Sequence, residues 1–175
     1  MQKAALILEG GAKRGVFTSG VLDYLMEQEY YIPHVIGVSA GSCNAVDYVS
    51  RQPGRTKACM IRSGEDGKII NFHNFFQTKS LLDMDLIFER DPKELHPFDF
   101  DTYFASDMTC EIVVTNCESG QAEYYSEKED GDRLMQLCRA SSSMPLVTPM
   151  VEIDGVPYLD GGIADSIPLI HSMRS

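Results

Sequence analysis

The residues best suited to chemistry lie at 37–41, where the chain reads Gly37-Val38-Ser39-Ala40-Gly41. An apolar run ends in this Gly-x-Ser-x-Gly pattern, and small residues open a helix after it. This is the sequence form of a nucleophile elbow, in which a strand turns sharply into a helix with the serine at the tip. Gly37 and Gly41 are needed because side chains there would collide where strand and helix pass closely. The pattern predicts that Ser39 is a nucleophile, and that the positive end of the following helix stabilises charge developing on a substrate oxygen.

A second candidate segment precedes the elbow, at Glu9-Gly10-Gly11-Ala12-Lys13-Arg14-Gly15. It follows a continuous apolar run over residues 4–8, which is typical of a buried parallel strand. A glycine-rich turn between a strand and a helix presents several backbone N–H groups to one point, so it can hold a phosphate or an oxyanion. The Gly-Lys-Ser/Thr ending of nucleotide-binding phosphate loops is missing. Taken alone, the turn is open to a structural as well as a functional interpretation.

The elements that must position these residues alternate along the start of the chain. After the strand at 4–8, apolar residues at helical spacing predict a helix that includes Phe17, Val21 and Tyr24. A strand at 35–38 and a helix at 40–50 follow. This order predicts an α/β fold with a mainly parallel sheet covered by helices. Since sites in such sheets lie at the carboxyl ends of strands, we expect the glycine loop and Ser39 side by side on adjacent strands.

The rest of the chain is less regular. Residues 111–115 and 121–126 predict a hairpin, 134–142 a helix, and Asp154-Gly155 a second hairpin turn. The apolar segments at 71–76 and 81–88 are either helical cover over the site entrance, able to contact an acyl chain, or a buried helical layer of the core. His73 and His96 are expected to be surface or packing residues.

Composition narrows the classes of function. The chain has 175 residues, of which 43% are hydrophobic and 23% charged, as in an ordinary globular protein. Its net charge of −11 argues against nucleic acid and against electrostatic docking on anionic lipid. No apolar run approaches the length of a membrane span, and the N-terminal apolar stretch is too short for a signal peptide. Five cysteines without close metal-type pairing predict a reducing, cytoplasmic location.

A hydrolytic serine needs a general base, and the residues leave two candidates open. Asp160 with His171 would give a Ser-Asp-His order, in which the histidine takes the proton. His34 precedes the strand that leads to Ser39, so it is expected at that strand's far end. In the alternative, Asp160 takes the proton directly, next to two flexible glycines. An exposed aspartate is a weak base, so such a pair requires a partly desolvated carboxylate with a raised pKa.

Three segments together resemble the patatin-like phospholipase family: the glycine loop at 9–15, the elbow at 37–41, and Asp160-Gly161-Gly162. They follow the family's order, and the resemblance runs from residue 4 to residue 168. It implies a three-layer α/β sandwich with a central, mainly parallel sheet, as a single domain over 1–175. It also implies lipid acyl-ester hydrolysis by a Ser–Asp dyad without a catalytic histidine, metal or cofactor.

The resemblance implies a role for each matched residue. By this resemblance, Ser39 would be the nucleophile and Asp160 the base. The backbone N–H groups of Gly10, Gly11 and Ala12 resemble the family's oxyanion hole. The supporting residues are Arg14, Gly37, Gly41 and Gly161.

Two features depart from the family pattern. Ala12 stands where the family has a third glycine, and an alanine does not easily adopt a positive φ. The chain also ends thirteen residues after Gly162, which is expected of a truncated product or a shortened variant.

We therefore expect a serine acyl-ester hydrolase whose partner is a lipid or acyl-ester substrate, with transient contact at a membrane surface and no nucleic acid. One alternative is an acyl transferase or thioesterase on the same elbow. A transferase would normally keep a histidine near the serine and a basic site for its carrier. The other alternative is a catalytically silent lipid-binding fragment, which the short C-terminus motivates.

Overall fold

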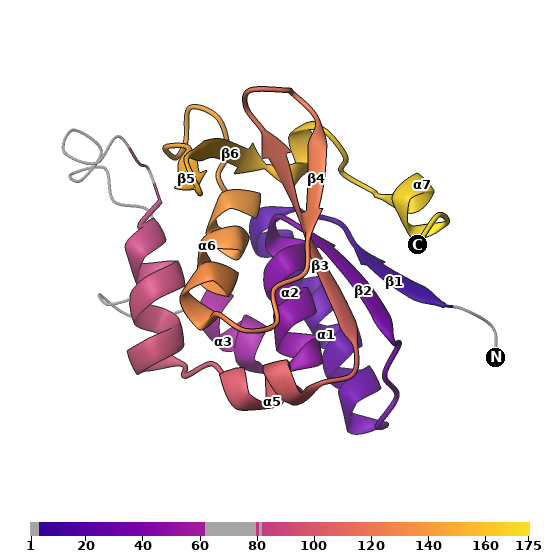
Figure 1. Ribbon diagram of the computed structural model, residues 1–175. Coiled ribbons are helices and arrows are strands. Elements are labelled where there is room, and N and C mark those ends of the chain that lie inside the picture. The colour runs from indigo at the N-terminus through magenta and orange to yellow at the C-terminus, as the bar shows by residue number, and fades with distance from the viewer. Residues whose placement is uncertain (1–3, 62–79, 81) are drawn as a thin grey trace.

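The computed structural model describes residues 4–61, 80 and 82–175 (Figure 1). Within this part of the chain lies a six-stranded sheet in the order β1 (Ala5–Leu8), β2 (His34–Val38), β3 (Thr109–Asn116), β6 (Val156–Asp160) and β5 (Val151–Ile153). β4 (Ala122–Tyr125) pairs separately with β3. β1, β2 and β3 are parallel, β4 and β6 run antiparallel to β3, and β5 runs antiparallel to β6. Strands β1, β2, β3 and β5 thus share one direction, which confirms the predicted α/β fold with a mainly parallel sheet.

One face of the sheet carries the main helical layer. α2 (Ala40–Val49) and α6 (Gly131–Ser141) lie against the strands, and α1 (Gly15–Glu27) packs beside α2 (Figure 1). The shorter helices α3 (Arg55–Met60), η3 (Leu86–Leu95) and α5 (Phe100–Ala105) extend this layer. The main hydrophobic core lies between these helices and the sheet. Because β1 pairs with β2, the glycine loop and the elbow leave adjacent strands, as predicted.

Residues of β4 and of the C-terminal segment cover the opposite face of the sheet. Ile36, Val38 and Val113 form a small buried cluster there, against which Tyr124 packs. The ring of His171, in α7 (Leu169–Ser172), stacks on the Tyr124 ring with centroids 3.5 Å apart. Helices therefore flank both faces, which confirms the three-layer arrangement.

α2 is the innermost helix of the main layer. Every residue of α2 except Cys43 is buried, which fits a segment of small and apolar side chains. The Tyr48 hydroxyl donates to the carbonyl oxygen of Tyr30 at 2.7 Å and accepts from the Ile32 amide at 3.0 Å. These bonds fix the C-terminal end of α2 to the loop before β2.

The later elements agree with the sequence where the structure describes them. Both hairpins form, β3 with β4 and β5 with β6, and Asp154 and Gly155 have φ values of 53° and 80°, as a tight hairpin turn requires. The helix at 134–142 corresponds to α6. The segment at 71–76, with His73, lies outside the described residues. No helix in the described part of the chain is long and apolar enough to span a bilayer.

Candidate active site

Ser39 occupies a strained turn between β2 and α2. Its backbone has φ 55° and ψ −127°, a region that non-glycine residues rarely adopt. The Ser39 amide donates to Ser141 Oγ at 2.8 Å. The amide and hydroxyl of Ser42 both donate to the Ser39 carbonyl oxygen, at 2.8 and 2.6 Å. These bonds satisfy the backbone of the turn and hold the serine at its tip.

The glycines around the elbow allow very close packing. A Cβ on Gly37 would lie 2.6 Å from the Gly41 carbonyl oxygen, and a Cβ on Gly41 would overlap the Leu8 carbonyl oxygen. A Cβ on Gly161 would overlap the Val113 carbonyl oxygen. The collisions predicted for Gly37 and Gly41 are therefore real, and Gly161 meets the same constraint beside Asp160.

Ser39 and Asp160 are in direct contact. Ser39 Oγ donates to Asp160 Oδ2 at 2.7 Å. The other carboxylate oxygen, Oδ1, accepts from the Gly162 amide at 2.8 Å. The backbone of Asp160 is held as well, because its amide donates to the Ser143 carbonyl oxygen and its carbonyl oxygen accepts from Thr115 Oγ1, both at 2.8 Å. The carboxylate is thus fixed with one oxygen aimed at the serine.

The surroundings of Asp160 favour its neutral form. The residue is only 7% exposed. Burial raises the pKa of its carboxyl above the ordinary value, and the hydrogen bonds from Ser39 and Gly162 offset part of that rise. Asp160 is consequently a stronger base than an exposed aspartate.

The glycine loop passes directly beside the nucleophile. A Cβ on Gly10 would lie 2.7 Å from Ser39 Cβ, so a side chain at this position would displace the serine. Gly11 has a φ of 152°, and Ala12, at the start of η1 (Ala12–Arg14), adopts a φ of 49° despite its Cβ. That conformation costs an alanine on the order of 1 kcal/mol. The exposed Arg14 lies near Gly11, since a Cβ there would be 3.5 Å from Arg14 Nε.

The described histidines lie elsewhere. His34 Nε2 and His171 Nε2 both bond to the carboxylate of Glu111, at 2.6 and 3.0 Å. His34 is the first residue of β2, so it lies at the far end of the strand that leads to Ser39, as predicted. The structure therefore places His171 with Glu111 and Tyr124, while the Ser39 hydroxyl bonds to Asp160 directly.

A cavity of about 320 Å³ lies beside Ser39. Its surface is mostly apolar, and its lining includes methionines from four segments: Met60, Met84, Met135 and Met144. Methionine side chains adapt readily to irregular apolar ligands. The segment at 81–88 was interpreted either as cover over the site or as a buried layer of the core. Where the structure describes this segment it fits both, because Met84 and Phe88 are buried in the core and also line the cavity.

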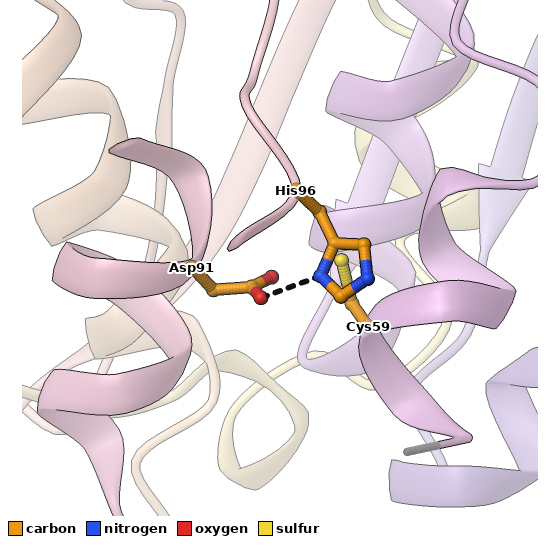
Figure 2. Close-up of side chains that lie close together, drawn as sticks. All are labelled: Cys59, Asp91 and His96. Carbon is orange, nitrogen blue, oxygen red and sulfur yellow. Dashed lines mark hydrogen bonds and ion pairs between the residues drawn. The ribbon is translucent and has the colours of Figure 1, made fainter. Parts of the chain in front are cut away.

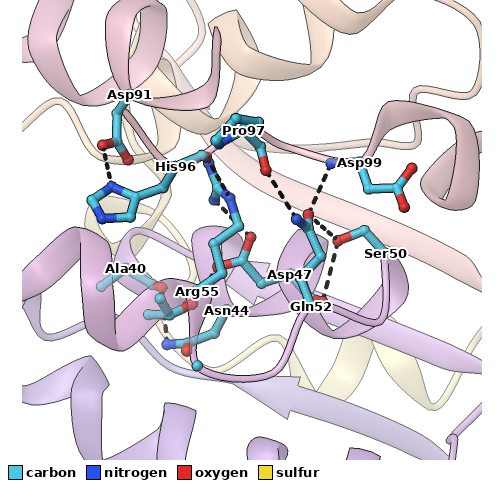
Figure 3. Close-up of polar contacts among 12 residues, drawn as sticks. Ala40, Asn44, Asp47, Ser50, Gln52, Arg55, Asp91, His96, Pro97 and Asp99 are labelled. Atoms are coloured by element: carbon cyan, nitrogen blue, oxygen red, sulfur yellow. Dashed lines mark hydrogen bonds and ion pairs between the residues drawn. The ribbon is translucent and has the colours of Figure 1, made fainter. Parts of the chain in front are cut away.

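A buried polar network lies in the wall of this cavity (Figure 3). Asp47 of α2 accepts from Arg55 Nη1 at 2.8 Å and from Thr56 Oγ1 at 2.5 Å. Burial raises the pKa of the Asp47 carboxyl, and the Arg55 charge opposes that rise. Arg55 Nε also donates to the His96 carbonyl oxygen at 3.1 Å. This network was not predicted from the sequence, although Asp47, a charged residue inside the apolar helix at 40–50, was a signal for it.

Known proteins are similar to this chain over most of its length. A family model described as patatin-like phospholipase matches residues 6–172, a span that includes the glycine loop, the elbow and Asp160. The chain is also 29% identical over 177 residues to the uncharacterized protein YjjU of Escherichia coli (strain K12), with 98% of this chain and 49% of that protein covered. The chain thus spans about half the length of this curated relative. Since the family match covers nearly the whole sequence, the chain belongs to the patatin-like phospholipase family.

Proposed function

We propose that this chain is a serine acyl-ester hydrolase that acts on lipid or lipid-like esters. The observation that carries the proposal is the 2.7 Å hydrogen bond from Ser39 Oγ to Asp160 Oδ2. Family membership supports hydrolysis of lipid esters in general. The apolar cavity beside Ser39 suits the acyl chain of such an ester.

The first half of the reaction forms an acyl-enzyme. Asp160 accepts the Ser39 proton as Oγ attacks the ester carbonyl carbon. The negative charge that develops on the carbonyl oxygen is stabilised by amides of the glycine loop, at Gly10, Gly11 and Ala12, and by the start of α2. Collapse of this intermediate breaks the ester bond, and protonated Asp160 gives its proton to the leaving alcohol.

The second half releases the acid. Asp160 accepts a proton from water as the water oxygen attacks the acyl carbon on Ser39. The second tetrahedral intermediate uses the same amides. When it collapses, the bond to Ser39 breaks, the fatty acid leaves, and Ser39 Oγ regains its proton from Asp160.

The surroundings of Asp160 explain how an aspartate can accept the proton of Ser39 or of water without a histidine. The Gly162 amide occupies Oδ1, so Oδ2 remains for the serine or for water. Burial raises the pKa of the carboxyl, which brings its basicity closer to that of the group it must deprotonate.

Hydrolysis of a short chromogenic acyl ester tests the proposal. We expect turnover by the purified chain, background rates for Ser39→Ala, and an unchanged rate for Ser119→Ala, whose serine lies in the exposed turn between β3 and β4. Folded wild type that binds acyl esters without turnover would contradict the proposal and support a silent lipid-binding role. Activity retained by Ser39→Ala would show that the nucleophile is another residue.

A further inference from the structure

Three side chains with metal-binding groups converge beside the cavity (Figure 2). Cys59 lies near the end of α3, Asp91 lies within η3, and His96 directly follows η3. One sulfur, one carboxylate oxygen and one imidazole nitrogen from these residues all lie within 4.8 Å of one another. His96, expected to be a surface or packing residue, bonds through Nδ1 to Asp91 Oδ1 at 2.7 Å.

We propose that Cys59, Asp91 and His96 form a zinc-binding site that bridges α3 and η3. Thiolate, imidazole and carboxylate are the three ligand types that zinc takes in proteins. A thiolate together with an imidazole disfavours Mg²⁺ and Ca²⁺, which prefer oxygen ligands. Three protein ligands leave one tetrahedral position open for water or another small ligand.

The three ligand atoms already lie close to the spacing that a zinc site requires. Zinc–ligand bonds of about 2.0–2.3 Å in a tetrahedron put the ligand atoms roughly 3.3–3.7 Å apart. His96 Nδ1 and Asp91 Oδ1 are nearer than this, at 2.7 Å, and all three ligand atoms lie within 4.8 Å of one another. Zinc entry therefore parts the imidazole and carboxylate slightly and releases the protons that the ligand groups carry.

Hydrogen bonds hold the backbone on both sides of the His96 side chain in place (Figure 3). The His96 amide donates to the Asp91 carbonyl oxygen at 2.9 Å, and Arg55 Nε donates to the His96 carbonyl oxygen at 3.1 Å. Gln52 Nε2 donates to the next carbonyl oxygen, that of Pro97, at 3.0 Å. The His96 ring is therefore presented to Asp91 from a fixed backbone.

The charges around the site suit a divalent cation. Ionised Cys59 and Asp91 together neutralise Zn²⁺, and His96 binds as a neutral ligand. The nearby positive charge of Arg55 is offset by its buried partner Asp47, 2.8 Å away. Since Cys59 and Asp91 both line the cavity, a bound zinc would also join its α3 and η3 walls.

Cobalt(II) titration of the metal-stripped full chain tests the site, because a thiolate ligand gives a charge-transfer absorption that carboxylates alone do not. We expect saturation at one equivalent and displacement by Zn²⁺. Cys59→Ser should lose this absorption, and His96→Gln should bind at least ~10-fold more weakly. Cys117→Ser is the matched control, because this partly buried thiol lies in the turn after β3, outside the cluster, and should retain the signal.

Thermal unfolding gives a second readout that is independent of ester hydrolysis. One equivalent of Zn²⁺ should raise the Tm of wild type and of Cys117→Ser, and leave that of Cys59→Ser unchanged. The proposal is overturned if wild type shows no thiolate absorption, if Cys59→Ser keeps it, or if cobalt binds without saturation. The last result would mark weak binding to surface carboxylates, which a chain of net charge −11 carries in excess.

Discussion

Asp160→Asn separates the proton-accepting role of Asp160 from its structural role. Asparagine has nearly the same shape, and its carbonyl oxygen can accept from the Gly162 amide as Oδ1 does at 2.8 Å. Its NH₂ group, however, would face Ser39 Oγ where Oδ2 now accepts at 2.7 Å. The variant therefore keeps the turn after β6 and cannot take the serine proton.

The expected loss of activity follows from this geometry. The 2.7 Å contact lies within the reach of a general base, and it joins the two groups without a histidine between them. Removing the base should lower kcat/KM by ~10²–10⁴-fold, which corresponds to about 2.7–5.4 kcal/mol in the barrier.

Asp160→Asn should lower activity without lowering the stability of the fold. Because burial raises the pKa of Asp160 above its unfolded value, stability from the protonated carboxyl is fully present below the unfolded pKa and is lost as pH rises through the folded pKa. Asparagine cannot ionise, so the free energy of unfolding of Asp160→Asn at neutral pH should equal or exceed that of wild type.

Steady-state hydrolysis of a chromogenic acyl ester and denaturant unfolding measure the two effects. Asp165→Asn is the matched control, because this carboxylate accepts from the Tyr124 hydroxyl at 2.7 Å and lies outside the Ser39–Asp160 pair. Its activity should stay within about twofold of wild type. The reasoning is refuted if folded Asp160→Asn keeps activity within tenfold of wild type while Ser39→Ala is inactive.

Further predictions concern the oxyanion loop, pH and the cavity. Gly10→Ala should lower kcat by ~10²-fold or more, measured on folded protein, because its Cβ would lie 2.7 Å from Ser39 Cβ; wild-type kcat would contradict the placement of the loop. Ala12→Gly should raise the free energy of unfolding by up to about 1 kcal/mol in denaturant melts, since it removes the cost of a φ of 49° at alanine; a clear destabilisation would contradict that origin. A pH profile of kcat/KM should fall as Asp160 is protonated, with its midpoint above the ordinary value of 3.8, and a midpoint at or below 3.8 would oppose the effect of burial. Met60→Phe should shift preference toward shorter acyl chains in an ester series by narrowing the cavity, and an unchanged preference would place the acyl chain elsewhere.

The start of the fold could be predicted because its signals are local. Apolar periodicity, the glycine loop and the elbow fall in strict alternation, so the sequence indicates two adjacent parallel strands with Ser39 at the end of the second. The approach of Asp160 could not be predicted in the same way. Local pattern does not fix the direction of a strand within a sheet, and β6 reaches Ser39 by running antiparallel to β3.

Other features depend on contacts between distant segments. Pro92 lies inside η3, although proline normally ends a helix. Phe88 and Asp91 of the same helix are buried against the rest of the chain. Cys59, Asp91 and His96 have no motif spacing, so only the folded chain shows that their ligand atoms converge. Asp47 was detectable as a charged residue in an apolar helix, but the sequence did not indicate that Arg55 is its partner.

The central claim is that Asp160 activates Ser39 for acyl transfer. Its most direct test is labelling with an alkyl fluorophosphonate, which traps an activated serine, followed by peptide mass spectrometry. The account predicts a single adduct at Ser39, no adduct in Ser39→Ala, and labelling at least ~10²-fold slower in Asp160→Asn. An adduct on a different residue, or labelling of Asp160→Asn at the wild-type rate, would contradict it.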